Sequence, residues 1–193
     1  MASDDRERTM GRVCYSMIVS LDGYVEDAAG SIAFLEPDEE VHRLANEQAR
    51  SAAAFLFGRR LYEVMEEPWT AAAARADLPE VEREFARIYL DTPRIMFSDT
   101  LDTVPDGVRV VRRDQAEAEV RRLKRSTEGD LSLGGPTLAA ALVDLIDEFA
   151  MFVLPVVLGG GTPYLAAGTR VPLRLAEQRT FPSGTVYLRY VRA

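Results

Sequence analysis

Short apolar runs alternate along most of the chain with stretches in which hydrophobic residues recur at helical spacing. Apolar runs bounded by turn-forming residues are typical of buried strands, whereas the helical spacing is typical of amphipathic helices. The segment 69–79 mixes alanines with prolines and is expected to form a loop or a weak helix. The expected strands are 13–19, 53–57, 94–98, 108–112, 131–133, 148–158, 173–180 and 184–192, and the expected helices are 38–50, 59–65, 80–89, 114–126 and 136–145.

Strands that alternate with helices predict an α/β protein built as a three-layer α/β/α sandwich around a mostly parallel sheet. The last two strands flank Pro182-Ser183-Gly184, which predicts an antiparallel C-terminal hairpin. Pro155 lies inside an apolar run and indicates a bulge or an edge there, because proline has no N–H to donate. We expect residues 1–10 to form a disordered tail and residues 11–193 to form a single domain.

The segment LSLGGPTLAAALVDL at 131–145 is the most informative part of the chain, because a strand-like run meets a helix-like run at two glycines. Pro136 suits the first helical position. A helix N-terminus presents unpaired N–H groups and roughly half a positive charge, so Gly134 and Gly135 are candidates for binding phosphate, although they could merely turn the chain. The residues expected on one helix face are Leu138, Ala141, Leu142 and Leu145.

A second junction of the same kind is FLFGRRLYE at 55–63, where Gly58 ends an apolar run. Ligands of open α/β sheets bind beyond the carboxyl ends of the strands, so both junctions are expected to face one crevice that could hold a pyrophosphate. Arg59 or Arg60 could add a charge-assisted contact. Neither junction is a Walker loop or the Gly-x-Gly-x-x-Gly fingerprint, which argues against phosphoryl transfer.

Composition and charge exclude several other classes of protein. The chain has 193 residues, 47% of them hydrophobic, and no apolar run approaches the length that crosses a bilayer. The polar start MASDDRER lacks the features of a secretory signal, so we expect a cytoplasmic protein. A net charge of −8 argues against nucleic acid as a partner, and the basic stretch 112–125, interleaved with glutamates, is expected to be a solvated helix face.

The chain contains one cysteine and one histidine, which argues against a disulfide, a Cys-rich zinc site or any metal centre of that kind. Cys14 lies in the first apolar run and is expected to be a core residue. A Ser-His-Asp triad would have to use His42, yet the chain has no Gly-x-Ser-x-Gly elbow.

Five segments in this order resemble the dihydrofolate reductase-like superfamily, most closely the branch that contains the C-terminal reductase domain of the bacterial riboflavin-biosynthesis deaminase-reductase. The segments are SLDGY (20–24), FGRRLYE (57–63), IMFSDTL (95–101), LGGPTL (133–138) and DEFAMFVLPVVLGGGTPYL (147–165). The resemblance spans nearly the whole chain. It implies a reductase that uses NADPH on a small-molecule substrate and forms a homodimer, with the nicotinamide against the first strand and the pyrophosphate at the two glycine junctions.

The same resemblance assigns residues to the site. The family usually has threonine where this chain has Leu61, so one hydroxyl contact to phosphate is absent. The residues assigned to the cofactor are Gly58, Arg59 and Arg60 in the first turn, Gly134, Gly135, Pro136, Thr137 and Leu138 in the second, and Ser98 beside the adenosine 2′-phosphate. The residues assigned to the border of the substrate pocket are Ser20, Asp22 and Gly23.

Hydride transfer also needs a proton source, and three residues are candidates. Asp22 is one, although Asp-Gly is also an ordinary turn. Asp38 and His42 are the others, because they share a helical face that could point toward the crevice. Equally, Asp38 could cap the helix while His42 packs at its edge.

The substrate stays open at this stage, as an unidentified small heterocyclic or carbonyl compound. The zinc-deaminase signature of the bifunctional enzymes is absent, but a stand-alone reductase of the ribosylated pyrimidine is compatible with the sequence. A non-catalytic, dimeric, nucleotide-binding regulatory protein is the alternative from another class. Gly159, Gly160 and Gly161 could approach either the cofactor or a neighbouring strand.

Overall fold

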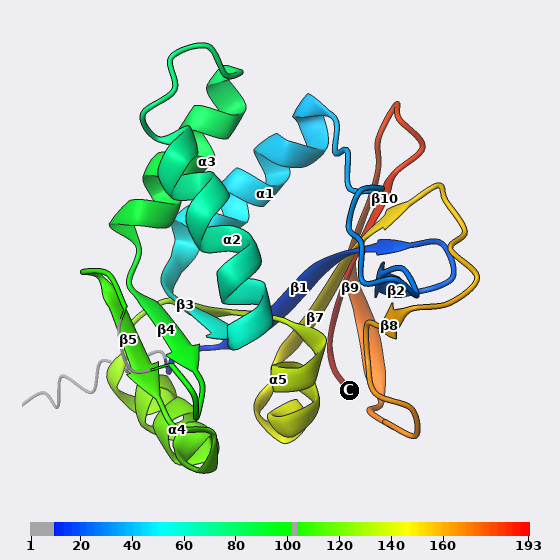
Figure 1. The fold of residues 1–193 in the computed structure, drawn as a ribbon. Coiled ribbons are helices and arrows are strands. Elements are labelled where there is room, and N and C mark those ends of the chain that lie inside the picture. Colours follow the sequence, from blue (N-terminus) through cyan, green and yellow to red (C-terminus); the bar gives the residue numbers. More distant parts are fainter. Residues whose placement is uncertain (1–9, 102–103) are drawn as a thin grey trace, which may run out of the picture.

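The computed structural model describes residues 10–101 and 104–193, which form eight-stranded and two-stranded sheets with helices (Figure 1). The predicted tail, residues 1–10, lies outside the described residues except for Met10, so the division into a tail and a domain stays a prediction. The strands are β1 (Val13–Ser20), β2 (Tyr24–Glu26), β3 (Ala52–Gly58), β4 (Arg94–Phe97), β5 (Val108–Val111), β6 (Asp130–Gly134), β7 (Glu148–Leu154), β8 (Thr162–Pro163), β9 (Leu173–Thr180) and β10 (Val186–Arg192). The α-helices are α1 (Glu39–Ser51), α2 (Arg59–Ala72), α3 (Glu80–Asp91), α4 (Ala116–Ser126) and α5 (Pro136–Ala141).

The large sheet has the strand order β5-β4-β3-β6-β1-β7-β10-β9. Its first six strands pair in parallel, and β10 runs antiparallel to both β7 and β9. The predicted, mostly parallel sheet with an antiparallel C-terminal hairpin is therefore confirmed. Because β3 and β6 are parallel neighbours, with Phe57 paired to Gly134, the carboxyl ends of these two strands lie side by side.

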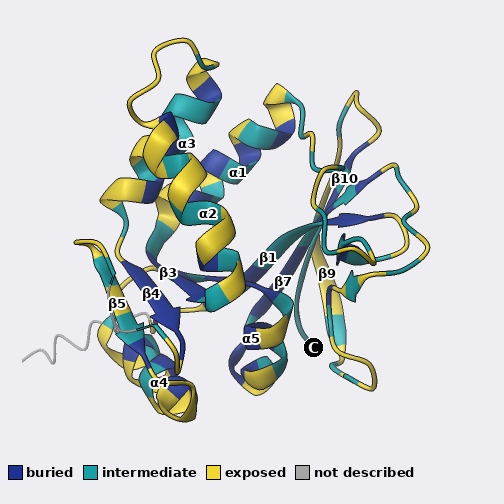
Figure 2. Cartoon of the chain, viewed as in Figure 1, coloured by how far each residue is buried: buried dark blue, intermediate teal, exposed yellow. Residues whose placement is uncertain are grey.

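Helices cover both faces of the sheet, which confirms the predicted three layers. Figure 1 shows α1, α2 and α3 on one side of the strands and α4 and α5 on the other. Alternation along β1 explains this, since Val13, Tyr15 and Val19 pack in the core beneath α4 and α5, whereas Ile18 packs with α1. The central strands are accordingly the most buried part of the chain (Figure 2).

Two helices differ in length from the prediction. Helix α2 continues through Pro68 to Ala72, so residues 69–72 of the segment expected to form a loop or a weak helix are helical. Proline costs this helix one backbone hydrogen bond, but packing of its buried face outweighs that loss. Helix α5 ends at Ala141, because Leu142 leaves helical geometry (φ −112°, ψ 14°) before a short 3-10 turn. Ala141 is therefore exposed, and its predicted place on the buried face is wrong.

Strand β7 ends at Leu154, immediately before Pro155. It lies between β1 and β10 in the interior of the sheet, so Pro155 terminates a central strand, and the predicted bulge or edge is wrong. The continuing chain returns as β8, which pairs with β2 in the small second sheet that the sequence did not predict. Strands this short carry too few residues for a periodic pattern.

Candidate active site

A cavity of about 660 Å³ contains both glycine junctions in its lining. Its walls come from two regions, namely the carboxyl ends of β3 and β6 with the starts of α2 and α5, and the sheet face beneath α1, α2 and α3. The structure thus brings together Gly58, Arg59, Arg60 and the segment 134–138, which the sequence assigns to the cofactor. Within the described residues, no helix is both long enough and apolar enough to span a bilayer.

The first junction is the step from β3 into α2. Gly58 is the N-terminal cap of α2, and it supplies no side chain to bond the first turn. The backbone N–H groups of Arg59 and Arg60 belong to that first turn, whose donors have no acceptor within the helix. Their partial positive charge faces the same cavity that Gly58 lines.

The second junction is the step from β6 into α5. Gly135 has φ +95°, a left-handed conformation that glycine adopts without strain, and this turn aims the start of α5 at the cavity. A Cβ at Gly134 would overlap the side chain of Leu61. Leu61 therefore packs against Gly134, in the place where the family usually has threonine, and brings an apolar surface between the two junctions. Thr137, in the first turn of α5, is exposed.

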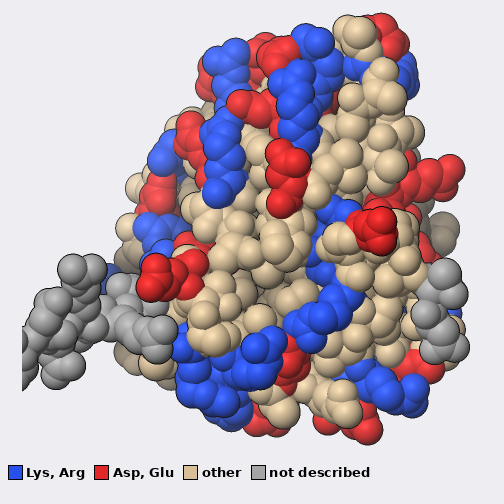
Figure 3. All heavy atoms as spheres, turned by 90° about the vertical axis from the view of Figure 1, so that its left-hand side faces the viewer, with Lys and Arg blue, Asp and Glu red and all other residues tan. Residues whose placement is uncertain are grey.

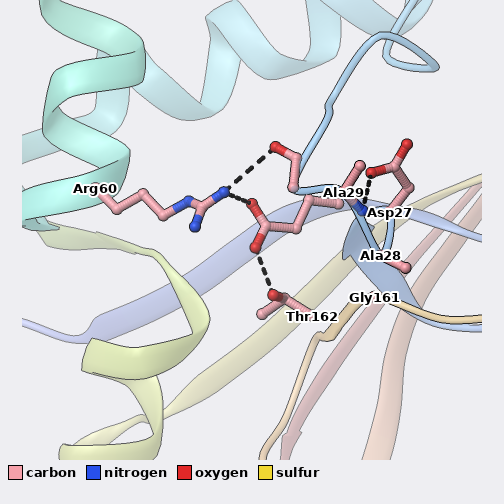
Figure 4. A pocket seen from close by; sticks show the side chains of 8 residues that line it. Asp27, Ala28, Ala29, Arg60, Gly161 and Thr162 are labelled. Atoms are coloured by element: carbon pink, nitrogen blue, oxygen red, sulfur yellow. Dashed lines mark hydrogen bonds and ion pairs between the residues drawn. The ribbon is translucent and has the colours of Figure 1, made fainter.

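The two arginines of the first junction point in different directions. Arg59 donates to Glu63 Oε1 at 2.6 Å and to Thr100 Oγ1 at 2.7 Å. Arg60 crosses to strand β2, where it pairs with Glu26 Oε2 at 2.7 Å (Figure 4). Thr162 of β8 donates to the other oxygen of Glu26. This group, Arg60, Glu26 and Thr162, lies in a second, neighbouring pocket of about 520 Å³ and is called the mouth cluster below.

Arg113 is a cavity residue that the sequence reasoning missed. It follows β5, lines the cavity, and lies 3.8 Å from the carboxylate of Asp99. Its position could have been inferred from its place at the carboxyl end of a parallel strand, but the surrounding basic stretch obscured it. Ser98, by contrast, is 2% exposed and accepts a hydrogen bond from the Thr100 N–H, so its hydroxyl holds the loop after β4.

Most of the other basic residues in this stretch are paired with acidic residues. Arg121 bonds Glu117, and Arg122 bonds Glu119, within α4. Arg109 of β5 also reaches Glu119, and these contacts lower the pKa of Glu119 to about 2. Figure 3 shows acidic and basic side chains interspersed over this side of the molecule. The arrangement is that of a solvated helix face.

The backbone of the SLDGY turn and the carboxylate of Asp22 within it have a structural role. Ser20 is fully buried and accepts from the Tyr24 N–H, while Gly23 turns the chain at φ +85°. The Asp22 carboxylate accepts from Leu158 N–H at 3.1 Å and Gly159 N–H at 2.8 Å, and these backbone bonds lower its pKa. Ser20, Asp22 and Gly23 are not among the described residues that line the cavity.

Asp38 and His42 adopt the alternative arrangement considered for them. Asp38 is the N-terminal cap of α1, and its side chain accepts from the Val41 N–H at 2.8 Å. His42 packs against the rings of Trp69 and Phe85, with centroid distances of 5.9 and 5.8 Å, and burial lowers its pKa. Neither residue is among those that line the cavity.

The glycine run before β8 approaches another strand. Gly161 has φ +135°, and a Cβ there would overlap the backbone carbonyl of Glu26. Gly159 donates to Asp22. The close approach is therefore between β2 and the segment leading into β8. Of the two alternatives for Gly161, an approach to the cofactor or to a neighbouring strand, the structure shows the second.

Several polar residues in the cavity were not predicted. Ser16 of β1, Gln48 of α1 and Ser132 of β6 line it on the side covered by α1, α2 and α3. The Ser16 hydroxyl lies 3.5 Å from Gln48 Oε1. A serine inside an otherwise apolar strand was the available signal, but the sequence alone does not say which helix faces it.

Comparison with known proteins identifies the family. The profile of the RibD C-terminal domain family matches residues 12–187. Protein YyaP of Bacillus subtilis (strain 168), which is uncharacterized, is 28% identical over 185 residues, with 93% of this chain and 94% of that protein covered.

Two solved structures show the same fold at low identity. A diaminohydroxyphosphoribosylaminopyrimidine deaminase/5-amino-6-(5-phosphoribosylamino)uracil reductase from Thermotoga maritima has a TM-score of 0.66 at 14% identity, over 95% of this chain and 57% of that one. A dihydrofolate reductase from Enterococcus faecalis, complexed with NADP(H) and RAB-propyl, has a TM-score of 0.64 at 15% identity, over 95% and 97%. The predicted dihydrofolate reductase-like fold is confirmed, and the chain belongs to the RibD C-terminal domain family.

Proposed function

We propose that this member of the family is an NADPH-dependent reductase that transfers hydride to a small heterocyclic or carbonyl substrate. The observation that carries the proposal is the meeting of two helix starts, those of α2 and α5, at adjacent parallel strands beside one cavity. Two such N-termini suit two neighbouring phosphate groups, as in a pyrophosphate. Arg59, Arg60 and Arg113 add positive charge at the same end of the cavity.

The residues present fit such a cofactor. The backbone N–H groups of the two first turns would bind the pyrophosphate, and Arg113, beyond β5 at the edge of the sheet, would bind the 2′-phosphate that distinguishes NADPH from NADH. When bound, the dihydronicotinamide supplies the hydride. The chain's own part is to hold the reacting groups in contact.

The proton that accompanies the hydride comes from water in this proposal, because Asp22, Asp38 and His42 are all placed away from the cavity lining. Glu26 is the one carboxylate among the described lining residues, and it is engaged by Arg60 and Thr162. A phosphate group at the first junction would compete with Glu26 for Arg60, so the mouth cluster is expected to rearrange when a cofactor binds.

Calorimetric titration of the purified protein with NADPH tests the proposal. We expect a dissociation constant in the micromolar range or below, and weaker binding of NADH. Arg60→Gln is expected to weaken NADPH binding roughly tenfold, since it removes a charge-assisted contact. Arg43→Gln, which breaks an exposed pair with Glu39 on α1, is the matched control and should change nothing. Absence of NADPH binding up to millimolar concentration would overturn the proposal.

The second candidate is the non-catalytic nucleotide-binding regulatory protein. The observation that favours it is the position of the three expected proton donors outside the cavity lining. Such a protein would bind NADPH without oxidising it in the presence of any substrate. Oxidation of NADPH, followed at 340 nm with a panel of carbonyl and heterocyclic compounds, separates the two candidates.

The homodimer remains part of the proposal and rests on the family resemblance, whereas the cytoplasmic location remains a prediction from the sequence. Light scattering coupled to size-exclusion chromatography measures the oligomeric state, and a mass of one chain would exclude the dimer.

A further inference from the structure

The inner part of the cavity lies between the sheet and the helices α1, α2 and α3, and we call it the inner chamber. Side chains that point to this face of the sheet line it, among them Ile18 of β1 and Phe152 of β7, which belong to the cluster beneath α1. The helices contribute aromatic and small apolar side chains. The residues used below to define the chamber are Ser16, Ala45, Gln48, Phe85, Tyr89 and Phe152.

The charged side chains that line the cavity lie at its other end. Within the described part of the chain they are Glu26, Arg59, Arg60 and Arg113, which belong to the mouth cluster, to the start of α2 and to the 3-10 turn that follows β5 (Arg113–Gln115). Each of the arginines already contacts an acidic residue. A phosphate or carboxylate group placed in the inner chamber would therefore lose its hydration without gaining a cation, which is strongly unfavourable.

The aromatic walls of the chamber favour a flat ligand. Phe85 and Tyr89 come from the same face of α3, with ring centroids 6.3 Å apart and 27° between the ring planes. Tyr89 is fully buried and supports Phe85, which is the partly exposed ring of the two. Tyr89 also stacks with Phe57 of β3, at 6.2 Å. Rings of this kind bury large areas and interact well with the faces or edges of another ring.

The polar groups of the chamber are neutral. Gln48 Oε1 lies 3.5 Å from the Ser16 hydroxyl, so a side-chain amide of α1 and a hydroxyl of β1 meet in the chamber. An amide and a hydroxyl can donate to, or accept from, a carbonyl oxygen, a hydroxyl group or a ring nitrogen. They do not compensate a full charge as an arginine or a lysine does.

We infer that the inner chamber takes an uncharged, flat, largely apolar ring compound that Gln48 and Ser16 orient through one hydrogen-bonding group. The inference rests on the proposed function, since this compound would be the hydride acceptor beside the cofactor. It disfavours the phosphorylated ribosyl-pyrimidine as a substrate, because the cations that line the cavity, Arg59, Arg60 and Arg113, are the ones that the proposed function assigns to the phosphates of the cofactor.

Two probes that share one ring system test the inference, namely 2-naphthol, which is neutral at pH 7, and 2-naphthyl phosphate. Each is titrated by calorimetry into the protein saturated with NADPH, so that the phosphate sites of the cofactor are filled. We expect 2-naphthol to bind at least tenfold more tightly than 2-naphthyl phosphate. Equal or tighter binding of the phosphate, or no binding of 2-naphthol, would overturn the inference.

Three variants locate the binding. Ala45→Met fills the chamber from α1 and should abolish binding of 2-naphthol while NADPH affinity stays within twofold of the original, which also shows that the variant is folded. Ala71→Met makes the same change at an exposed position of α2 and should leave both affinities unchanged. Gln48→Leu should weaken 2-naphthol binding roughly threefold to tenfold, as expected for the loss of one hydrogen bond. Unchanged 2-naphthol binding in Ala45→Met would place the probe elsewhere and overturn the inference.

Failure of the proposed function looks different in this experiment. If the protein binds 2-naphthol but no NADPH, and Ala45→Met removes the binding of 2-naphthol, the inferred ligand class is supported and the proposed reductase function is overturned. If the protein binds NADPH but prefers 2-naphthyl phosphate, the proposed reductase function stands and the inferred ligand class is overturned.

Discussion

At the scale of single residues, Asp22 uses both oxygens of its carboxylate to accept hydrogen bonds from the backbone. Its two oxygens accept N–H groups from Leu158 and Gly159, which lie far along the chain after β7. These bonds fix the SLDGY turn to the loop that leads into β8. A side chain with this role supports the position of the cavity wall without reaching the reacting atoms.

Asp22→Asn is expected to lower the melting temperature by a few degrees and to leave NADPH affinity nearly unchanged, since an amide accepts backbone bonds more weakly. The pKa of Asp22 is lowered in the folded protein, so its stabilising effect is present above the unfolded value near 3.9 and is lost as pH falls through the folded pKa. The difference in melting temperature between the two proteins should therefore shrink below about pH 4.

Scanning calorimetry at several pH values measures this difference. A variant that keeps the original melting temperature but loses turnover would instead make Asp22 a catalytic residue, contrary to its position in the structure.

The residues that sequence reasoning could place at the site are those whose role is fixed locally. Gly135 stands where a strand turns into a helix, and both the turn and the helix start can be inferred from the neighbouring residues. Gln48 and Ser16 could not be found in this way, because they meet only after β1 and α1 have packed together. Arg60 was assigned to the site from the sequence, but its pairing with Glu26 was not, because Glu26 belongs to a strand too short to predict.

At the scale of elements, the contact between β2 and β8 depends on one glycine. The backbone of Gly161 passes so close to Glu26 and Asp27 that no side chain fits between them. This approach sets the position of Glu26 and, through it, of Arg60 at the mouth of the cavity.

Gly161→Ala is expected to destabilise the protein by about 1–3 kcal/mol, because the backbone must leave a conformation that alanine rarely adopts and must also move away from β2. Gly160→Ala is the matched control. A Cβ at Gly160 meets no atom within 4 Å, and the residue does not have positive φ. The Gly160→Ala variant should therefore be nearly as stable as the original protein. Urea unfolding of both variants gives the comparison, and equal stabilities would contradict the close packing of β2 against Gly161.

Element types were predictable where the period of the pattern was clear. Strands β1, β3 and β4 and helices α1, α3 and α4 follow the apolar pattern closely. The ends of α2, α5 and β7 were not predictable in the same way. Packing carries α2 through Pro68, whereas Pro155 stops β7 although the apolar run continues to Leu158.

At the scale of the whole molecule, the sheet divides the core into two faces. The larger cluster lies beneath α4 and α5 and includes Leu131, which is fully buried between β1 and β3. The opposite face carries the inner chamber beneath α1, α2 and α3. The side chains on the α4 and α5 face of the strands therefore contribute mainly to stability. The side chains on the opposite face of the same strands line the chamber proposed to bind the ligand.

Leu131→Ala is expected to destabilise the protein by about 2–5 kcal/mol, the range for a large-to-small change in a packed core. Leu175→Ala, on edge strand β9 where the side chain is 44% exposed, should change the free energy of unfolding by less than about 0.5 kcal/mol. Guanidinium unfolding measures both. Similar losses in the two variants would contradict the assignment of the core to the central strands.

The two ends of the cavity are built from different kinds of group, and this has a consequence for how the family can diversify. The helix starts at Gly58 and Gly135 present backbone N–H groups, which are the same whatever side chains surround them. The inner chamber is formed by side chains such as Ala45, Gln48 and Phe85, which single mutations can replace. Under the proposed function, descendants of this chain can therefore acquire new substrates one residue at a time, while the backbone groups proposed to bind the cofactor are inherited unchanged.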